Sequence, residues 1–203
     1  MSSTKPISLF PLSVAVAALV ALSACGGSDD ASDPPQPDVT LAGSVSDLDE
    51  AAAASQPNWP AWSGGKQPVA GVGCANSEAY HAHTLVSIYR NGTRLAMPGS
   101  VGIGACTYEL HTHDGSGVVH VETDVRKDFT LSQYFALWGQ VMSASDVAGL
   151  PGPYRFYLVE DGKLSRYTGD PGAIVLSAHR EIVILAGPKP PAVLPKYRWP
   201  AEL

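Results

Sequence analysis

The chain has 203 residues, and its 13 Lys and Arg are outnumbered by 19 Asp and Glu, which gives a formal net charge of −6 at pH 7. This balance lacks the positive potential that draws a protein to nucleic acid or to an anionic lipid surface, so the charge argues against both kinds of partner. The acidity is too mild to indicate a substrate.

The first 25 residues indicate export. Lys5 gives a short positive region, and residues 7–22 are almost wholly apolar but too short and too closely followed by polar sequence to span a membrane comfortably. The run ends in the sequence LSAC at residues 22–25, which resembles the lipobox of bacterial lipoproteins. The resemblance implies that Cys25 is acylated and that residues 1–24, a lipoprotein signal peptide, are removed. An ordinary secretory signal cleaved near the same place is the alternative.

A lipoprotein of this kind belongs to the bacterial cell envelope. Several acyl chains on Cys25 would hold it in the lipid bilayer far more firmly than a single chain. Gly26 stands where an Asp would favour the inner membrane, so we expect the outer membrane, facing the periplasm. We expect residues 25–60 to be the acylated Cys and a flexible tether, with at most a loosely docked helix over 47–56. A single β-rich domain, residues 61–203, should follow, and its length is usual for one domain.

Two cysteines remain after lipidation, Cys74 and Cys106. An exported chain meets an oxidising compartment, so we expect a disulfide between them. In the chain-entropy model such a loop contributes about 3–4 kcal/mol to stability. A thiolate pair that binds copper or zinc is the alternative, although the spacing is not that of a CxxC site.

Alternating apolar residues between turn signals predict a mainly β domain. The expected strand pairs are 79–90 with 93–97, 106–113 with 118–123, 153–160 with 163–168, and 173–177 with 181–186. Thr130 and Gln133 form a capping-box pattern and Gly139 can end a helix, which predicts one short helix between them. The proline-rich tail from Pro188 should lie extended over the domain, with its aromatic residues packed. We therefore expect an antiparallel sandwich or a small barrel of hairpins with one short helix.

Five of the six histidines fall between residues 81 and 120, at alternating spacing. In a β-strand residues i and i+2 point to the same face, so such pairs present their side chains together. Imidazoles clustered with carboxylates are common ligands of transition metal ions. The predicted metal site consists of His81, His83, His111, His113, His120 and Glu122.

The second hairpin predicts which of these side chains meet. If residues 115–116 form a two-residue turn, His111 faces His120, and Glu109 faces Glu122. Opposed residues have Cβ atoms about 4.5–5.5 Å apart, so the two imidazoles could share an ion. Two opposed carboxylates repel each other unless a cation or a proton lies near them, which is a further argument for a metal.

The strand that carries His81 and His83 must supply the rest of the site. If it lies beside residues 111–113, four or five imidazoles converge, more than the three or four ligands that one zinc or copper site needs. The extra imidazoles could hydrogen-bond to the ligands or carry protons. The alternative is that this polar strand face is merely solvated. His179 lies apart beside Arg180, and we interpret it as a surface residue.

The motifs HAH at 81–83, LHTHD at 110–114 and HVE at 120–122 also resemble those of a group of uncharacterised exported bacterial proteins. The likeness extends through the predicted helix that ends at Gly139. It implies no known activity.

Three functions remain open at this point. The first is a metal-binding lipoprotein for binding, buffering or delivery, with copper or zinc ahead of iron because nitrogen ligands favour those ions. The second is a metal-dependent enzyme, a hydrolase or an oxidoreductase, in which a spare imidazole or Glu122 would act as base. The third is a cell-surface adhesion or assembly module without a metal. The sequence does not identify a protein partner.

Overall fold

The computed structural model describes residues 38–48 and 58–203, and the statements below concern these two ranges. All of them belong to the compact unit that spans Pro34–Leu203. The expected signal peptide, Cys25 and most of the expected helix over 47–56 lie outside the described residues. Within the described ranges, no helix is both long and apolar enough to cross a membrane.

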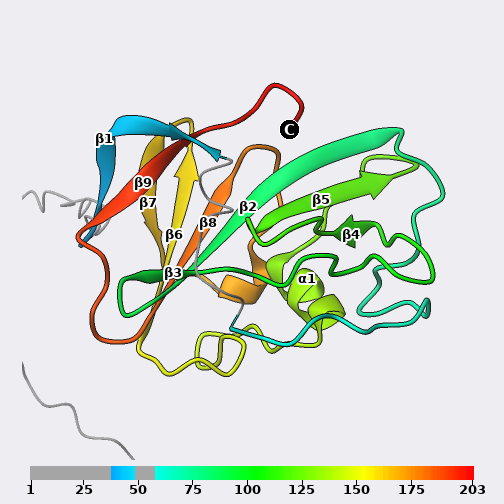
Figure 1. Ribbon diagram of the computed structural model, residues 1–203, viewed down its shortest axis with the longest axis horizontal. Coiled ribbons are helices and arrows are strands. Elements are labelled where there is room, and N and C mark those ends of the chain that lie inside the picture. Colours follow the sequence, from blue (N-terminus) through cyan, green and yellow to red (C-terminus); the bar gives the residue numbers. More distant parts are fainter. Residues whose placement is uncertain (1–37, 49–57) are drawn as a thin grey trace, which may run out of the picture. The chain divides into compact units, whose positions relative to one another are not determined.

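Most strands form one seven-stranded mixed sheet (Figure 1). Its members are β2 Tyr80–Arg90, β3 Thr93–Leu95, β4 Leu110–His111, β5 Val118–Thr123, β6 Tyr154–Glu160, β7 Lys163–Tyr167 and β8 Glu181–Ala186. They lie in the order β4-β5-β2-β8-β6-β7, and β3 pairs with the last part of β2. Only β2 and β8 run parallel to each other, while the other neighbouring pairs are antiparallel.

A second, two-stranded sheet consists of β1, Thr40–Asp47, and β9, Val193–Arg198, which are parallel. Buried Val39 and Leu194, at this small sheet, pack against side chains of β2, β6 and β8, so the two sheets form a sandwich and not a closed barrel. The expected tether thus contains a strand, and the proline-rich tail is itself a strand. Local composition missed β1 because its partner is about 150 residues away in sequence.

The opposite face of the large sheet is covered by the predicted helix, α1, Leu131–Trp138. The backbone N–H of Thr130 donates to Oε1 of Gln133 at 2.9 Å, and Gly139 ends the helix with a φ of 83°. Both capping signals are therefore confirmed. The apolar face of α1 packs into the largest hydrophobic core of the protein. Its buried members are Leu131, Tyr134, Phe135, Leu137 and Trp138.

Three of the four expected strand pairs are present, although β3 and β4 are shorter than predicted. The fourth is wrong: residues 173–177 do not pair with β8, and a 3₁₀ helix occupies Pro171–Ala173 instead. β8 lies between β2 and β6, and all six of its residues are buried. Its nearly continuous apolar sequence is typical of a strand inside a sheet with both faces covered.

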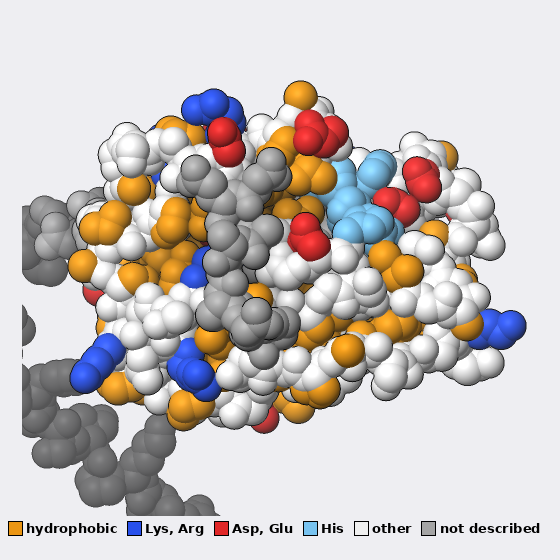
Figure 2. Space-filling model, viewed as in Figure 1, with side chains coloured by type: hydrophobic (Ala, Val, Ile, Leu, Met, Phe, Trp, Pro, Cys, Tyr) orange, Lys and Arg blue, Asp and Glu red, His pale blue; other side chains and the backbone are white. Residues whose placement is uncertain are grey.

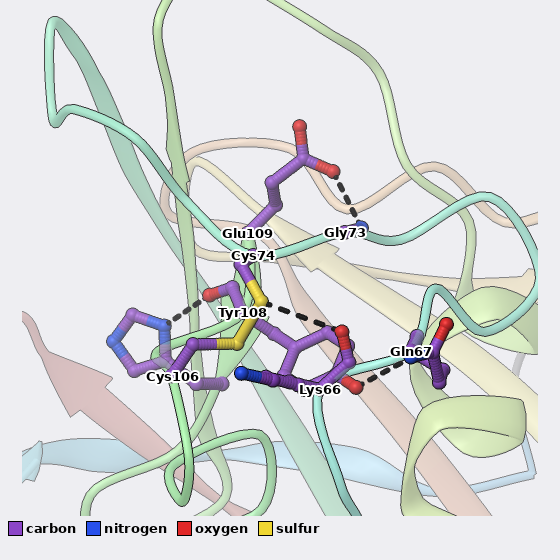
Figure 3. The surroundings of a disulfide bond; sticks show 8 residues. Lys66, Gln67, Gly73, Cys74, Cys106, Tyr108 and Glu109 are labelled. Carbon is purple, nitrogen blue, oxygen red and sulfur yellow. Dashed lines mark hydrogen bonds between the residues drawn. A yellow bond between two sulfur atoms is a disulfide. The ribbon is translucent and has the colours of Figure 1, made fainter.

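The predicted disulfide joins Cys74 and Cys106 (Figure 3). It lies beside the segment that leads into β4, where the hydroxyl of Tyr108 donates to the carbonyl of Gln67 at 2.7 Å. In the same segment the carboxylate of Glu109 accepts from the backbone N–H of Gly73 at 2.9 Å. The thiolate-ligand alternative is therefore excluded for these cysteines, and their bond fixes the chain directly before His111.

Candidate metal centre

The five clustered histidines meet on one face of the large sheet, at the end formed by β4, β5 and β2 (Figure 2). β5 is the middle strand of the three. His120 on β5 therefore has His111 of β4 as its register partner on one side and His83 of β2 on the other. Glu122 is paired with His81 in the same way. The predicted pairing of His111 with His120 is confirmed, but β2 adjoins β5 and not the strand of His111.

Strand alternation separates this polar face from the core. Leu110, Val119 and Val121 point to the opposite side and belong to the main hydrophobic cluster. The chain also packs closely behind the site at Gly102, which has a φ of 77°. A Cβ there would collide with the carbonyl of Leu110 and lie 3.0 Å from the Cβ of His111. A glycine is thus required at this position for two reasons, its backbone conformation and the lack of space.

The donor atoms of four residues converge around Nδ1 of His120. This nitrogen lies 3.1 Å from Nε2 of His83 and 3.3 Å from Nε2 of His81. It also lies 3.6 Å from Oε1 of Glu122, which in turn lies 3.1 Å from Nε2 of His81. Zinc binds imidazole nitrogen at about 2.0–2.1 Å, so tetrahedral ligand atoms lie about 3.3 Å from one another. These four distances, of the six that four ligand atoms define, are therefore close to those of a tetrahedral site.

Hydrogen bonds alone do not account for this arrangement. A ring nitrogen of neutral imidazole either donates one proton or offers one lone pair. Nδ1 of His120 nevertheless has three polar neighbours within 3.6 Å, from His81, His83 and Glu122. A metal ion would satisfy all four donor atoms together.

A hydrogen bond orients His111 so that its Nε2 can bind a metal ion. Its side chain is almost fully buried, and its Nδ1 lies 3.0 Å from the backbone carbonyl of Tyr108. Because a carbonyl only accepts, the proton is on Nδ1 and the lone pair of the neutral ring is on Nε2. That Nε2 lies 3.5 Å from Oε1 of Glu122. This outer hydrogen bond is the kind that fixes the tautomer of a metal-binding histidine.

Two further residues widen the cluster. His113 is exposed, and its ligand atom falls within 4.8 Å of those of His111 and His120. Glu78 stands in the same relation to His81 and Glu122. The sequence prediction missed Glu78 because it precedes β2 and does not follow the i, i+2 spacing. All six residues that the sequence predicted for the site do lie together in the structure.

Burial keeps the inner histidines uncharged. Desolvation, reinforced by the neighbouring imidazoles, lowers the pKa of His83 from 6.5 to about 4 and that of His120 to about 3. Burial also lowers the pKa of His111, although the carbonyl of Tyr108 and the charge of Glu122 oppose this. Protons therefore compete little with a metal for these rings at neutral pH.

One argument from the sequence is wrong in its detail. The backbones of Glu109 and Glu122 do pair, since the N–H of Glu122 donates to the carbonyl of Glu109 at 2.9 Å. The carboxylate of Glu109, however, forms an ion pair with Lys127 at 2.7 Å, and that of Glu122 contacts His81, His111 and His120. Repulsion between the two glutamates therefore does not require a metal, and the case depends on the imidazole geometry.

A cavity of about 470 Å³ adjoins the cluster at His113 and His120. Its walls are mostly apolar, with Leu48, Val118 and Leu203 among them. The side chain of His179 takes no part in the cluster, because its Nε2 contacts the carbonyl of Leu203 at 2.8 Å and its ring stacks on Trp199. The residue does not lie apart from the site as expected, since its backbone N–H donates to the carbonyl of His83 at 2.8 Å.

This arrangement of imidazoles is a group of side chains that could hold a metal ion. Comparison with protein families, curated proteins and solved structures gives no significant match, so the geometry of the site is the basis for assigning a function.

Proposed function

We propose that this protein is an exported bacterial lipoprotein that binds Zn(II) or Cu(II) through His81, His83, His120 and Glu122. The observation that carries the proposal is the convergence of these donor atoms: Nδ1 of His120 lies 3.1–3.6 Å from the other three, and Oε1 of Glu122 lies 3.1 Å from Nε2 of His81. Three imidazoles with one carboxylate form a donor set that favours copper and zinc over magnesium or calcium.

The accessibility of the site favours metal buffering or delivery. The side chain of His81 is 38% exposed, whereas that of His111 is only 1% exposed. An ion could therefore enter and leave past His81 while the buried rings keep their positions. A purely structural ion would gain nothing from an exposed ligand.

Export and lipid anchoring rest on the sequence before the described domain. The lipobox-like residues 22–25 support acylation of Cys25 in the envelope, and Gly26 favours the outer membrane. The Cys74–Cys106 disulfide is consistent with an oxidising compartment. In such a location the metal site would face the periplasm.

A metal-dependent enzyme is the second candidate, and the cavity beside His113 and His120 favours it. A pocket of this size with apolar walls could hold a small substrate next to the ion. A water on the metal would then be the nucleophile, and a histidine outside the coordination shell would be the base. This reading requires an open coordination position, while the buffering role does not.

Calorimetric titration of the untagged domain with Zn(II) and with Cu(II) tests the proposal. We expect binding at neutral pH that His120→Asn weakens at least a hundredfold, because the central donor is lost. His179→Asn is the matched control, since Asn tolerates the positive φ of 56° at that position. Equal and weak binding by all three proteins would leave the polar-face alternative, and with it a non-metal adhesion module, as the remaining explanation.

A further inference from the structure

The histidine cluster contains more donors than one ion uses. Two groups of three imidazoles each have their ligand atoms within 4.8 Å of one another. One group is His81, His83 and His120, and the other is His111, His113 and His120. A zinc or copper ion in a protein takes three or four such ligands, so a single ion leaves one or two of the five rings unused.

We propose that the cluster binds two transition metal ions, one on each side of His120, which both ions share. His81 and His83 hold the first ion, and His111 and His113 hold the second. This inference rests on the proposed metal binding at the same residues and extends it from one ion to two.

Strand order supports the shared position of His120. β5 lies between β2 and β4, so His83 and His111 flank His120 on the two neighbouring strands, on the same face of the sheet. The ring of His120 has its centre 4.4 Å from that of His83 and 5.0 Å from that of His111. The ring of His113 is also only 4.4 Å away. No other ring in the cluster has imidazoles of both groups on its two sides.

The chemistry of imidazole determines how the sharing works. Nδ1 of His120 faces Nε2 of His81 and of His83, so it serves the first ion. One nitrogen offers one lone pair to one metal, and the second ion must therefore bind Nε2. His120 then loses its remaining N–H proton to solvent and becomes a bridging imidazolate. Its negative charge reduces the repulsion between the two cations.

Glu122 provides an independent connection between the two groups. Its Oε1 lies 3.1 Å from Nε2 of His81 in the first group and 3.5 Å from Nε2 of His111 in the second. A carboxylate in this position can bind one ion or both. Glu78, whose ligand atom lies near those of His81 and Glu122, adds a further negative charge on the side of the first ion.

Two exposed histidines make a matched test, because His81 and His113 are the exposed members of their groups and their loss should not unfold the sheet. Equilibrium dialysis of the whole domain against Zn(II), followed by metal analysis, measures the ions bound per chain. We expect two ions in the wild type and in His179→Asn, and one ion in His81→Ala and in His113→Ala. Circular dichroism of each variant checks that it is folded.

The outcomes separate this inference from the proposed function. One ion in the wild type overturns the second site and leaves metal binding intact, whereas no ion in the wild type overturns both. Titration with Cu(II) tests the bridge itself. Two Cu(II) ions on one imidazolate couple magnetically, so the integrated electron paramagnetic resonance signal should fall as the second equivalent is added. A signal that doubles with the second equivalent would overturn the sharing of His120.

Discussion

The ring of His111 is held by the backbone carbonyl of Tyr108, only three residues earlier, at 3.0 Å from Nδ1. Tyr108 follows Cys106 closely and also forms a backbone bridge with Cys74, so the disulfide and the metal site share one short segment. The half-buried disulfide therefore influences the orientation of a buried imidazole.

Replacing both cysteines, in Cys74→Ser/Cys106→Ser, should lower stability and metal affinity together. Loss of the cross-link, whose cysteines are 32 residues apart, removes about 3–4 kcal/mol of the free energy of unfolding. Freedom of the Tyr108 carbonyl should weaken binding of the second Zn(II), the ion assigned to His111, about tenfold. Urea unfolding measures the first effect and calorimetry the second. Unchanged affinity in a folded double variant would show that the disulfide does not support the site.

Zn(II) should raise the melting temperature of the wild type, because the unfolded chain has no formed site. At a free metal concentration of one hundred times Kd, the gain is about 2.7 kcal/mol. In His83→Asn most of this gain should vanish, since Nε2 of His83 makes the shortest contact of the cluster with His120. Differential scanning fluorimetry with Zn(II) and with EDTA provides the comparison. A wild type whose melting temperature ignores Zn(II) would contradict the prediction.

Glu122→Gln should weaken Zn(II) binding at least tenfold, because the amide keeps the shape of the side chain but loses its charge. Glu109→Gln is the matched control, directly before the neighbouring strand β4. Its carboxylate is engaged with Lys127 at 2.7 Å and does not contact the imidazoles, so we expect the wild-type affinity. Calorimetry distinguishes the two variants. Equal losses would mean that general negative charge, and not coordination by Glu122, attracts the ion.

The metal-free domain should lose stability as the pH falls from about 6.5 towards 3. His83 and His120 have lowered pKa values, about 4 and 3, in the folded protein, so the unfolded chain takes up protons first. The stability that these two neutral rings contribute is fully present above pH 6.5. It is lost as the pH falls towards their pKa values in the folded protein. Glu181 acts in the opposite sense, because burial raises its pKa from 4.5 to about 7.

The lowered pKa values of His83, His120 and His111 should affect the free energy of unfolding more than the raised pKa of Glu181 does. Urea unfolding in EDTA at pH 7.5 and at pH 5 gives the sign directly. His120→Gln should reduce the loss between these two pH values, while His179→Asn, which removes one minor cause of the lowered pKa of His83, should change it far less. A metal-free domain that is more stable at pH 5 than at pH 7.5 would show that Glu181 dominates.

Lipidation can be tested independently of the metal. Cys25→Ser should abolish labelling by palmitate and leave the protein either unprocessed or released from the membrane, because the lipobox-like sequence needs the thiol. Detergent partition and metabolic labelling in bacteria give the result. A variant that labels and partitions as the wild type does would rule out acylation at this position.

The local parts of the fold and of the site could be predicted from the sequence. The tight turn after His113 sets the register of His111 with His120, because a short hairpin leaves few ways to pair its strands. The i, i+2 spacing then places Glu122 on the same face as His120. The capping residues of α1, Thr130, Gln133 and Gly139, are likewise local signals.

The remaining features depend on contacts between distant parts of the chain. Periodicity shows that His81 and His83 share a face, but it does not show that their strand joins β5, because pairing depends on which apolar surfaces are buried together. The same holds for β8 in the middle of the sheet and for β1 beside β9. The sequence thus determined which side chains share one face of a strand. The tertiary structure alone decided that His111 and His83 lie on opposite sides of His120, since long-range strand order is not encoded in local alternation.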